Sequence, residues 1–159
     1  MKETIKVEKI KLSHRKIYTD IIINAPAAQV WNVLKDTNAY KNWAAFLVDI
    51  KGELIDGGKI TAQFQLNPSK EKYNTIEHTI QVEEGTEFYW AEEGPMGICD
   101  NHHFKVESIN EETSKFIQSD ELTKGATWFL GNLLAKTYAK GYQAFNKQLK
   151  IEVERRFRS

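Results

Sequence analysis

Acid–base and metal chemistry would be served best by the segment Cys99–His103, where a thiol, a carboxylate and two imidazoles lie close together in the chain. Such groups exchange protons near neutral pH or bind metals. Cys99 and His102 are spaced like a pair of ligands, but no second pair is spaced to complete four. His102 and His103 are adjacent, and adjacent side chains of a strand point to opposite faces. The sequence therefore predicts no metal site and no cofactor.

Two neighbouring carboxylates, Asp120 and Glu121, form the second group with chemical potential. They end a predicted strand beside the mouth of the expected interior, and strand alternation directs one of them inward. A carboxyl group in an apolar pocket has a raised pKa and can exchange protons near neutral pH. His102 shares the parity of Phe104, so its imidazole is expected to face the interior as well. The candidate catalytic residues are His102, Asp120, Glu121 and Tyr138, with a plain structural role as the alternative for each.

Other classes of chemistry and of partner find no support. There is no G-x-S-x-G motif, and Gly52, Gly57 and Gly58 do not form a phosphate-binding loop. The net charge of zero argues against a nucleic-acid partner. The single cysteine, Cys99, is typical of a reducing compartment. Because no signal-like start and no long apolar run are present, we expect a cytoplasmic protein without a membrane span.

A long helix and an antiparallel sheet must position these residues. Residues 125–159 contain no proline and place polar side chains, Asn146 among them, on one side at helical spacing. The opposite, apolar stripe consists of Leu130, Leu134, Tyr138, Gly141, Phe145 and Leu149. The hydroxyls of Tyr138 and Tyr142 need partners if they are buried, and they could orient a ligand. This pattern predicts one amphipathic helix that covers a sheet.

The preceding residues predict that sheet. Lys9–Asn24 is expected to form one strand, Ala27–Lys35 a short helix after Pro26, and Asp36–Trp43 a second helical turn. About six antiparallel strands follow, separated by turn residues. Their predicted ranges are Phe46–Leu54, Lys59–Leu66, Tyr73–Val82, Thr86–Glu92, Asn101–Ile109 and Ser114–Leu122.

The order of several short motifs resembles the SRPBCC superfamily, which includes START-related and birch-pollen-allergen-like proteins, and in particular its polyketide cyclase/dehydrase-like branch. The similar segments are Ile23–Trp31, Asp36 with Tyr40 and Trp43, Gly52–Glu53, Gly57–Ile60, His102–Phe104, Phe116–Glu121 and Gly141–Lys150. The resemblance implies an α+β helix-grip fold, in which a curved antiparallel sheet of about six to seven strands wraps around a long C-terminal helix. Two short helices after the first strand and an enclosed apolar cavity are expected. Residues 1–159 would form one domain, with residues 1–15 as an N-terminal extension.

The resemblance implies binding, with transport as a further role, of a small hydrophobic molecule such as a lipid, an isoprenoid or an aromatic polyketide. The expected ligand-binding residues are Trp31, Trp43, Phe64, Trp90, Phe104, Trp128, Leu134, Tyr138, Gly141 and Phe145. A cyclase/dehydratase-like enzyme that moves protons with polar pocket residues is the alternative. A protein-interaction module of the co-chaperone kind is a second alternative, since the basic segments Lys2–Lys16 and Arg155–Arg158 could contact an acidic partner.

Overall fold

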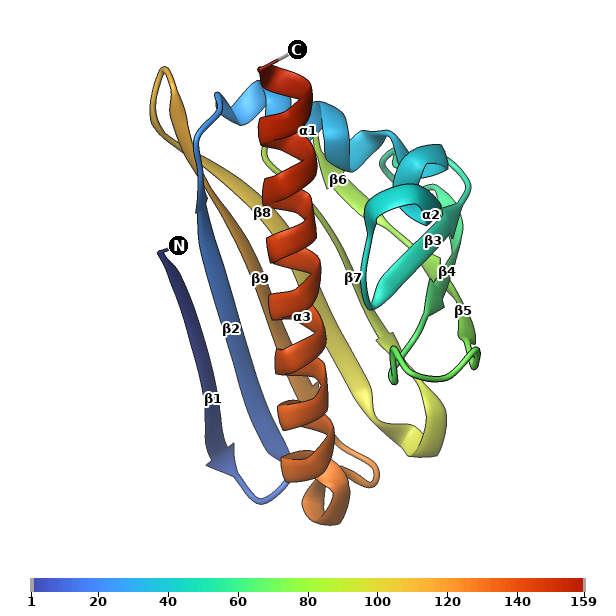
Figure 1. The fold of residues 1–159 in the computed structure, drawn as a ribbon. Helices are drawn as coiled ribbons and strands as arrows, with labels where there is room; N and C mark the ends of the chain where they lie inside the picture. The colour runs from blue at the N-terminus through green and yellow to red at the C-terminus, as the bar shows by residue number, and fades with distance from the viewer. Residues whose placement is uncertain (1, 159) are drawn as a thin grey trace.

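A long C-terminal helix lies across a curved antiparallel sheet (Figure 1). The computed structural model describes residues 2–158. The larger sheet has six strands in the order β1-β2-β9-β8-β7-β6, and a smaller sheet has the order β3-β4-β5. The strands are β1 (Glu3–Lys11), β2 (His14–Ile23), β3 (Leu47–Lys51), β4 (Lys59–Phe64), β5 (Asn74–Thr79), β6 (Gln81–Glu83), β7 (Glu87–Glu93), β8 (Cys99–Asn110) and β9 (Thr113–Thr123). The helix-grip architecture expected from the sequence is confirmed.

Two short helices close one end of the sheet (Figure 1). They are α1 (Ala27–Lys35) and α2 (Tyr40–Trp43), joined by the 3-10 turn η1 (Thr37–Ala39). Pro26 lies immediately before α1, where its missing N–H removes no helical bond. Val30, Trp31 and Leu34 of α1 are buried against the core. These helices match the predicted pair.

The first strand was predicted wrongly. Lys9–Asn24 is not one strand, because the chain turns at Leu12–Ser13 and returns as an antiparallel hairpin in which Lys11 pairs with His14. This turn contains no Gly, Pro or Asn, so the sequence carried no signal for it. Most of the segment expected as an N-terminal extension, residues 3–11, is therefore the edge strand β1; Met1 lies outside the described residues.

The predicted strand Tyr73–Val82 is divided by Ile80, which separates the two sheets. Residues before Ile80 pair with β4, and residues after it pair with β7. The Ile80 side chain is fully buried, and its N–H donates to the Gly58 carbonyl at 2.9 Å. A single buried residue thus turns the chain from the small sheet to the large one.

The C-terminal helix α3 (Thr127–Phe157) has 31 residues, so it is about 46 Å long. Ala135, Ala139, Tyr142, Phe145 and Leu149 face the sheet and are buried. The predicted polar position of Asn146 is wrong. Its amide is buried and bonds to Thr19 Oγ1 at 3.0 Å and to Gln118 Nε2 at 2.8 Å.

The ring of Phe46 approaches Gly141 of α3 closely. A Cβ atom at this position would lie only 2.2 Å from a carbon of that ring. Phe46 itself has a φ of 70°, a conformation that few non-glycine residues adopt. Because position 141 is glycine, the ring of Phe46, which immediately precedes β3, can pack directly on α3. None of the helices within residues 2–158 combines the length and the apolar character needed to cross a bilayer.

Candidate functional site

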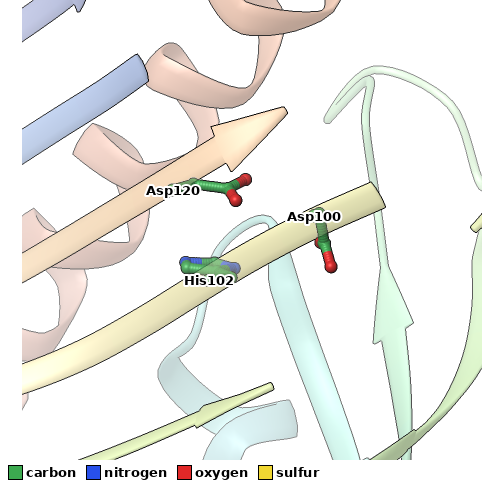
Figure 2. A group of neighbouring side chains, drawn as sticks. All are labelled: Asp100, His102 and Asp120. Carbon is green, nitrogen blue, oxygen red and sulfur yellow. The ribbon is translucent and has the colours of Figure 1, made fainter. Parts of the chain in front are cut away.

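Three polar side chains, Asp100, His102 and Asp120, converge inside the molecule (Figure 2). Asp100 and His102 are two residues apart on β8, so strand alternation places them on the same face. The register that pairs Asp100 with Leu122 and His103 with Ser119 puts Asp120 of β9 across from His102. One ligating atom from each of the three residues lies within 4.8 Å of the others. We call these residues the Asp–His–Asp cluster.

The protonation of His102 is determined by its neighbours. Its Nε2 lies 2.8 Å from Gln118 Oε1, and Gln118 Nε2 donates to the Tyr142 carbonyl at 3.3 Å and to Asn146 Oδ1 at 2.8 Å. A backbone carbonyl can only accept, so the amide orientation of Gln118 is determined and His102 Nε2 must be the donor. Burial lowers the pKa of His102 to about 3. His102 is therefore neutral, and its Nδ1 carries a lone pair.

Asp120 is held by two hydrogen bonds. The Tyr142 hydroxyl donates to its Oδ2 at 2.6 Å, and the Asn101 N–H donates to its Oδ1 at 3.1 Å. Burial raises the pKa of Asp120 to about 6, while these two bonds favour the carboxylate and limit the rise. At pH 7 Asp120 is mainly ionised.

Asp100 differs in protonation from Asp120. The Trp90 indole N–H donates to its Oδ2 at 3.3 Å. Burial, together with the nearby charge of Asp120, raises the pKa of Asp100 to about 8. Within residues 2–158, no Lys or Arg forms an ion pair with either carboxyl group. The pair thus shares one proton at neutral pH, and the larger rise in pKa is that of Asp100. Among residues 2–158, these three side chains are also the group that could hold a metal ion.

The cluster lies at the inner end of a cavity. The inner part, of about 60 Å³, is lined by Phe46, Phe64, Leu66, Asn74, Ile76, His78, Asp100, His102, Tyr138 and Tyr142. An outer part of about 300 Å³ shares several of these residues, Asp100 and Tyr138 included, and extends to Met96, Leu130 and Leu134. Asp120 does not line either part; it lies behind Tyr142 and His102. Of the two carboxyl groups in the cluster, Asp100 is therefore the one that a bound molecule can touch.

The cavity opens between β5, α3 and the loop that joins β7 to β8. This loop, residues 94–98, contains the 3-10 turn η2 (Pro95–Gly97) and lines the outer part. Across the opening, Glu92 of β7 binds β5 by two bonds: its Oε2 lies 2.9 Å from His78 Nδ1, and its Oε1 accepts from the Thr79 N–H at 2.8 Å. His78 in turn stacks on Trp90, with ring centroids 4.2 Å apart.

The predicted catalytic residues do not all meet at the site. His102 and Tyr138 line the cavity, and Asp120 belongs to the cluster. Glu121 points to the outer surface of the sheet, where its Oε2 lies 2.7 Å from His14 Nε2. Strand alternation, which directs only one of the two neighbouring carboxylates inward, explains this separation.

The predicted ligand-binding residues fall into three groups. Phe64, Leu134 and Tyr138 line the cavity. Those that pack in the core without lining it are Trp31, Trp43, Trp90, Phe104, Gly141 and Phe145. The interior position expected for Trp128 is wrong, because its side chain is 58% exposed and lies edge-on to Phe129.

Asp100 and Gln118 were missed as site residues. The spacing of Asp100 to His102 carried the signal, since two residues apart on a strand means the same face. Gln118 is two residues before Asp120, and the same rule would have placed it inside.

The chain belongs to a known family. Residues 14–154 match the model of the family described as polyketide cyclase / dehydrase and lipid transport. A comparison with curated protein sequences finds no match.

Several solved structures share the fold. The Zhui aromatase/cyclase from Streptomyces sp. R1128 has 16% identity and a TM-score of 0.74, covering 92% of this chain and 97% of that one. The di-domain aromatase/cyclase StfQ of the steffimycin biosynthetic pathway has 10% identity and a TM-score of 0.74, covering 93% of this chain and 53% of that one. A START superfamily protein from Mycobacterium smegmatis has 12% identity and a TM-score of 0.69, covering 88% and 97%. At these identities the similarity establishes the fold alone.

Proposed function

We propose that the protein binds a small, mostly apolar molecule in the cavity, with an uncharged oxygen of that molecule at the inner end. The observation that carries this proposal is the position of Asp100, a protonated carboxyl group on a cavity wall that also presents the apolar side chains of Phe46, Phe64, Leu66 and Ile76. Apolar walls favour a hydrophobic ligand, and a few convergent polar groups orient it. The description of the family, which includes lipid transport, supports the same class of function.

The charges of the site select the polar end of the ligand. Asp120 is ionised and lies close behind the inner end, so a carboxylate or phosphate would meet a like charge in a medium of low dielectric constant. A carbonyl or ether oxygen would instead accept a hydrogen bond from the Asp100 carboxyl group. The hydroxyl of Tyr138, which lines both parts of the cavity, is a second donor. The ligand class is therefore a neutral ketone, quinone or similar oxygenated apolar compound.

A matched pair of compounds tests this selectivity. An aromatic ketone and the carboxylic acid with the same carbon skeleton would be titrated into the protein by calorimetry at pH 7. The ketone should bind at least tenfold more tightly. Asp100→Leu should weaken ketone binding by about fivefold to tenfold, the value of one hydrogen bond of about 1 kcal/mol. Glu121→Gln, on the outer face of the same strands, is the control and should change nothing. Equal binding of ketone and acid, or binding unaffected in Asp100→Leu, would refute the proposed ligand class.

A second candidate function is acid–base catalysis of the cyclase or dehydratase kind. The observation that favours it is a carboxylic acid, Asp100, held within 4.8 Å of a carboxylate, Asp120. In such a reaction Asp100 would give its proton to a ligand hydroxyl that leaves as water, and the Asp100 carboxylate so formed would take the proton lost from the adjacent carbon as the C=C bond forms. The aromatase/cyclase neighbours have the same fold.

Binding and catalysis are separated by one variant. Asp100→Asn keeps the shape and a donor but has no transferable proton. If the protein only binds, this variant retains the ligand with little change, and incubation of the ligand with the wild type yields no product. If it catalyses, mass spectrometry detects loss of water with the wild type and none with Asp100→Asn, although both bind.

A further inference from the structure

One end of the molecule exposes a group of large apolar side chains. It is the end where α3 begins, and where the β1–β2 turn and the β7–β8 loop also lie (Figure 1). The exposed fractions are 60% for Leu12, 60% for Met96, 58% for Trp128, 54% for Phe129 and 65% for Leu133. We call these five residues the apolar tip. Single exposed apolar residues are ordinary, but a contiguous group of this size marks an interaction site.

Recorded contacts join the three segments that carry the apolar tip. The Ala126 N–H at the start of α3 donates to the Met96 carbonyl at 3.1 Å. Arg15 of β2 joins the β1–β2 turn to α3. It donates to the Leu12 carbonyl at 3.0 Å and to Asn132 Oδ1 of α3 at 2.7 Å. Because Arg15 is buried beneath these contacts, the tip is one ordered surface built on a folded base.

The side of the tip formed by α3 is basic, whereas Glu92 and Glu93 lie on the side that faces the cavity. From residue 122 to residue 151 the sequence contains no Asp or Glu but five lysines. Lys124 and Lys136 of this stretch are exposed, as is Lys11 in the turn, and none of the three forms an ion pair with another described residue. The first turn of α3 has no acidic residue, although a carboxylate there would stabilise the helix dipole. The part of the tip formed by α3 and the end of β1 is thus complementary to an anionic surface.

The apolar tip adjoins the opening of the cavity. Met96 belongs to both, and Leu130 and Leu134, which line the outer cavity, lie on the same helical turns as Phe129 and Leu133. A molecule that leaves the cavity on this side emerges next to Met96 and α3. Whatever covers the tip therefore also covers the opening.

We propose that the apolar tip docks on the surface of an anionic lipid bilayer, with Trp128, Phe129 and Leu133 in the headgroup region and the lysines against lipid phosphates. Aromatic and aliphatic side chains next to lysines are the combination that binds reversibly at such interfaces. Tryptophan in particular favours the boundary between headgroups and acyl chains. Docking in this orientation turns the opening towards the bilayer, which would give an apolar ligand a path that avoids water.

Vesicle co-sedimentation tests the proposal with the full-length protein and no added ligand. Binding to vesicles of phosphatidylcholine with one-third phosphatidylglycerol should exceed binding to pure phosphatidylcholine by at least tenfold, and it should fall as salt is raised. The double variant Phe129→Ser, Leu133→Ser should lose at least tenfold. The matched control Ile109→Ser, Ile151→Ser removes two isoleucines that are 51% and 54% exposed elsewhere, and it should bind like the wild type.

A second measurement reports on insertion directly. Trp128 is the most exposed of the four tryptophans, so lipids brominated in the acyl chains should quench its fluorescence. This quenching of tryptophan fluorescence should fall strongly in Trp128→Phe and remain in the control variant. Thermal melts in the absence of vesicles establish that all variants are folded.

Three results would overturn the proposal. The first is equal binding to charged and neutral vesicles, and the second is equal loss in the control variant. The third is a dimer in light scattering that the double variant abolishes, because a second copy of the chain would then cover the tip. Ligand titrations without vesicles should be unchanged in the double variant, so failure of membrane docking is distinguishable from failure of the cavity to bind.

Discussion

The hydroxyl of Tyr142 lies 2.6 Å from Oδ2 of Asp120, and this bond joins helix α3 to strand β9 behind the cavity. The phenol is fully buried, and burial together with the charge of Asp120 raises its pKa well above the ordinary value. Tyr142 therefore remains a donor at any pH at which the protein is folded. Its hydrogen bond favours the ionised form of Asp120, and the charge of Asp120 adds to burial, the larger cause, in raising the pKa of Asp100.

Replacing Tyr142 by phenylalanine should raise the pKa of Asp120. The carboxylate loses its shortest hydrogen bond, and a lost bond of about 1.5 kcal/mol to a charged group corresponds to roughly one pKa unit. Carboxyl ¹³C NMR of protein labelled at aspartate would follow the titration upward from about 6 in the wild type. In Tyr138→Phe, which removes a hydroxyl that donates to no described carboxylate, the Asp120 titration should stay in place. An unchanged Asp120 titration in Tyr142→Phe would contradict the network.

The stability of the protein should decrease as the pH rises from about 6.5 to 8. The folded-state pKa of Asp100, about 8, exceeds the ordinary aspartate value of 3.8, so the folded state holds a proton that the unfolded state has lost. The bound proton's contribution to the free energy of unfolding is complete at low pH. It is lost as the pH rises to about 8, at up to about 1.4 kcal/mol per pH unit. His102, with its pKa lowered to about 3, acts in the opposite direction only below about 6.5. Urea unfolding at several pH values measures the slope.

Asp100→Asn is the matched variant for this slope. It has no titrating group at position 100, so its free energy of unfolding should change much less between pH 6.5 and 8. At pH 8 it should approach or exceed the stability of the wild type. A slope as steep as that of the wild type would assign the proton to another group.

Gly141→Ala should destabilise the protein by about 1–3 kcal/mol, although alanine is the better helix former by about 1 kcal/mol. The added Cβ would lie 2.2 Å from the Phe46 ring, which must move. A double-mutant cycle with Phe46→Ala measures the coupling by urea unfolding: the alanine at position 141 should cost little or nothing once the ring is gone. Additive effects would show that the clash is not the cause.

Asn146→Leu should cost about 2–4 kcal/mol. It removes the acceptor for Gln118 and the donor to Thr19, and a buried network that is partly satisfied costs more than one bond. Thermal or urea unfolding provides the measurement. Gln148→Leu, two residues further on the same helix and only half-buried, should change the stability by less than about 0.5 kcal/mol.

The fold was accessible from the sequence because its main signals are periodic. The alternation in Lys59–Phe64 and the helical spacing after Thr127 both repeat often enough to survive single exceptions. The β1–β2 turn was not accessible, since Leu12–Ser13 contains no Gly, Pro or Asn and the strand-like composition continues through it. Pairing with β9 along the whole of β2 holds the hairpin together, and this is a long-range contact that no local pattern records.

The site was only partly accessible. Alternation gave the inward direction of His102 and of one carboxylate in Asp120–Glu121. Alternation did not predict the burial of Asn146, whose amide is stabilised by partners far away in the chain. It also did not predict the exposure of Trp128, because α3 begins beyond the edge of the core. In each case the side chain follows its three-dimensional neighbours and not its hydrophobicity.

No backbone ladder joins β5 to β7 within residues 2–158, and the Glu92 side chain spans the gap instead. The aperture of the cavity therefore depends on the reach of one flexible side chain and on the pivot at Ile80. Replacing Glu92 offers a way to make the opening wider or narrower while every strand pairing is kept. The size of the ligand and the stability of the fold can therefore be engineered separately in this scaffold.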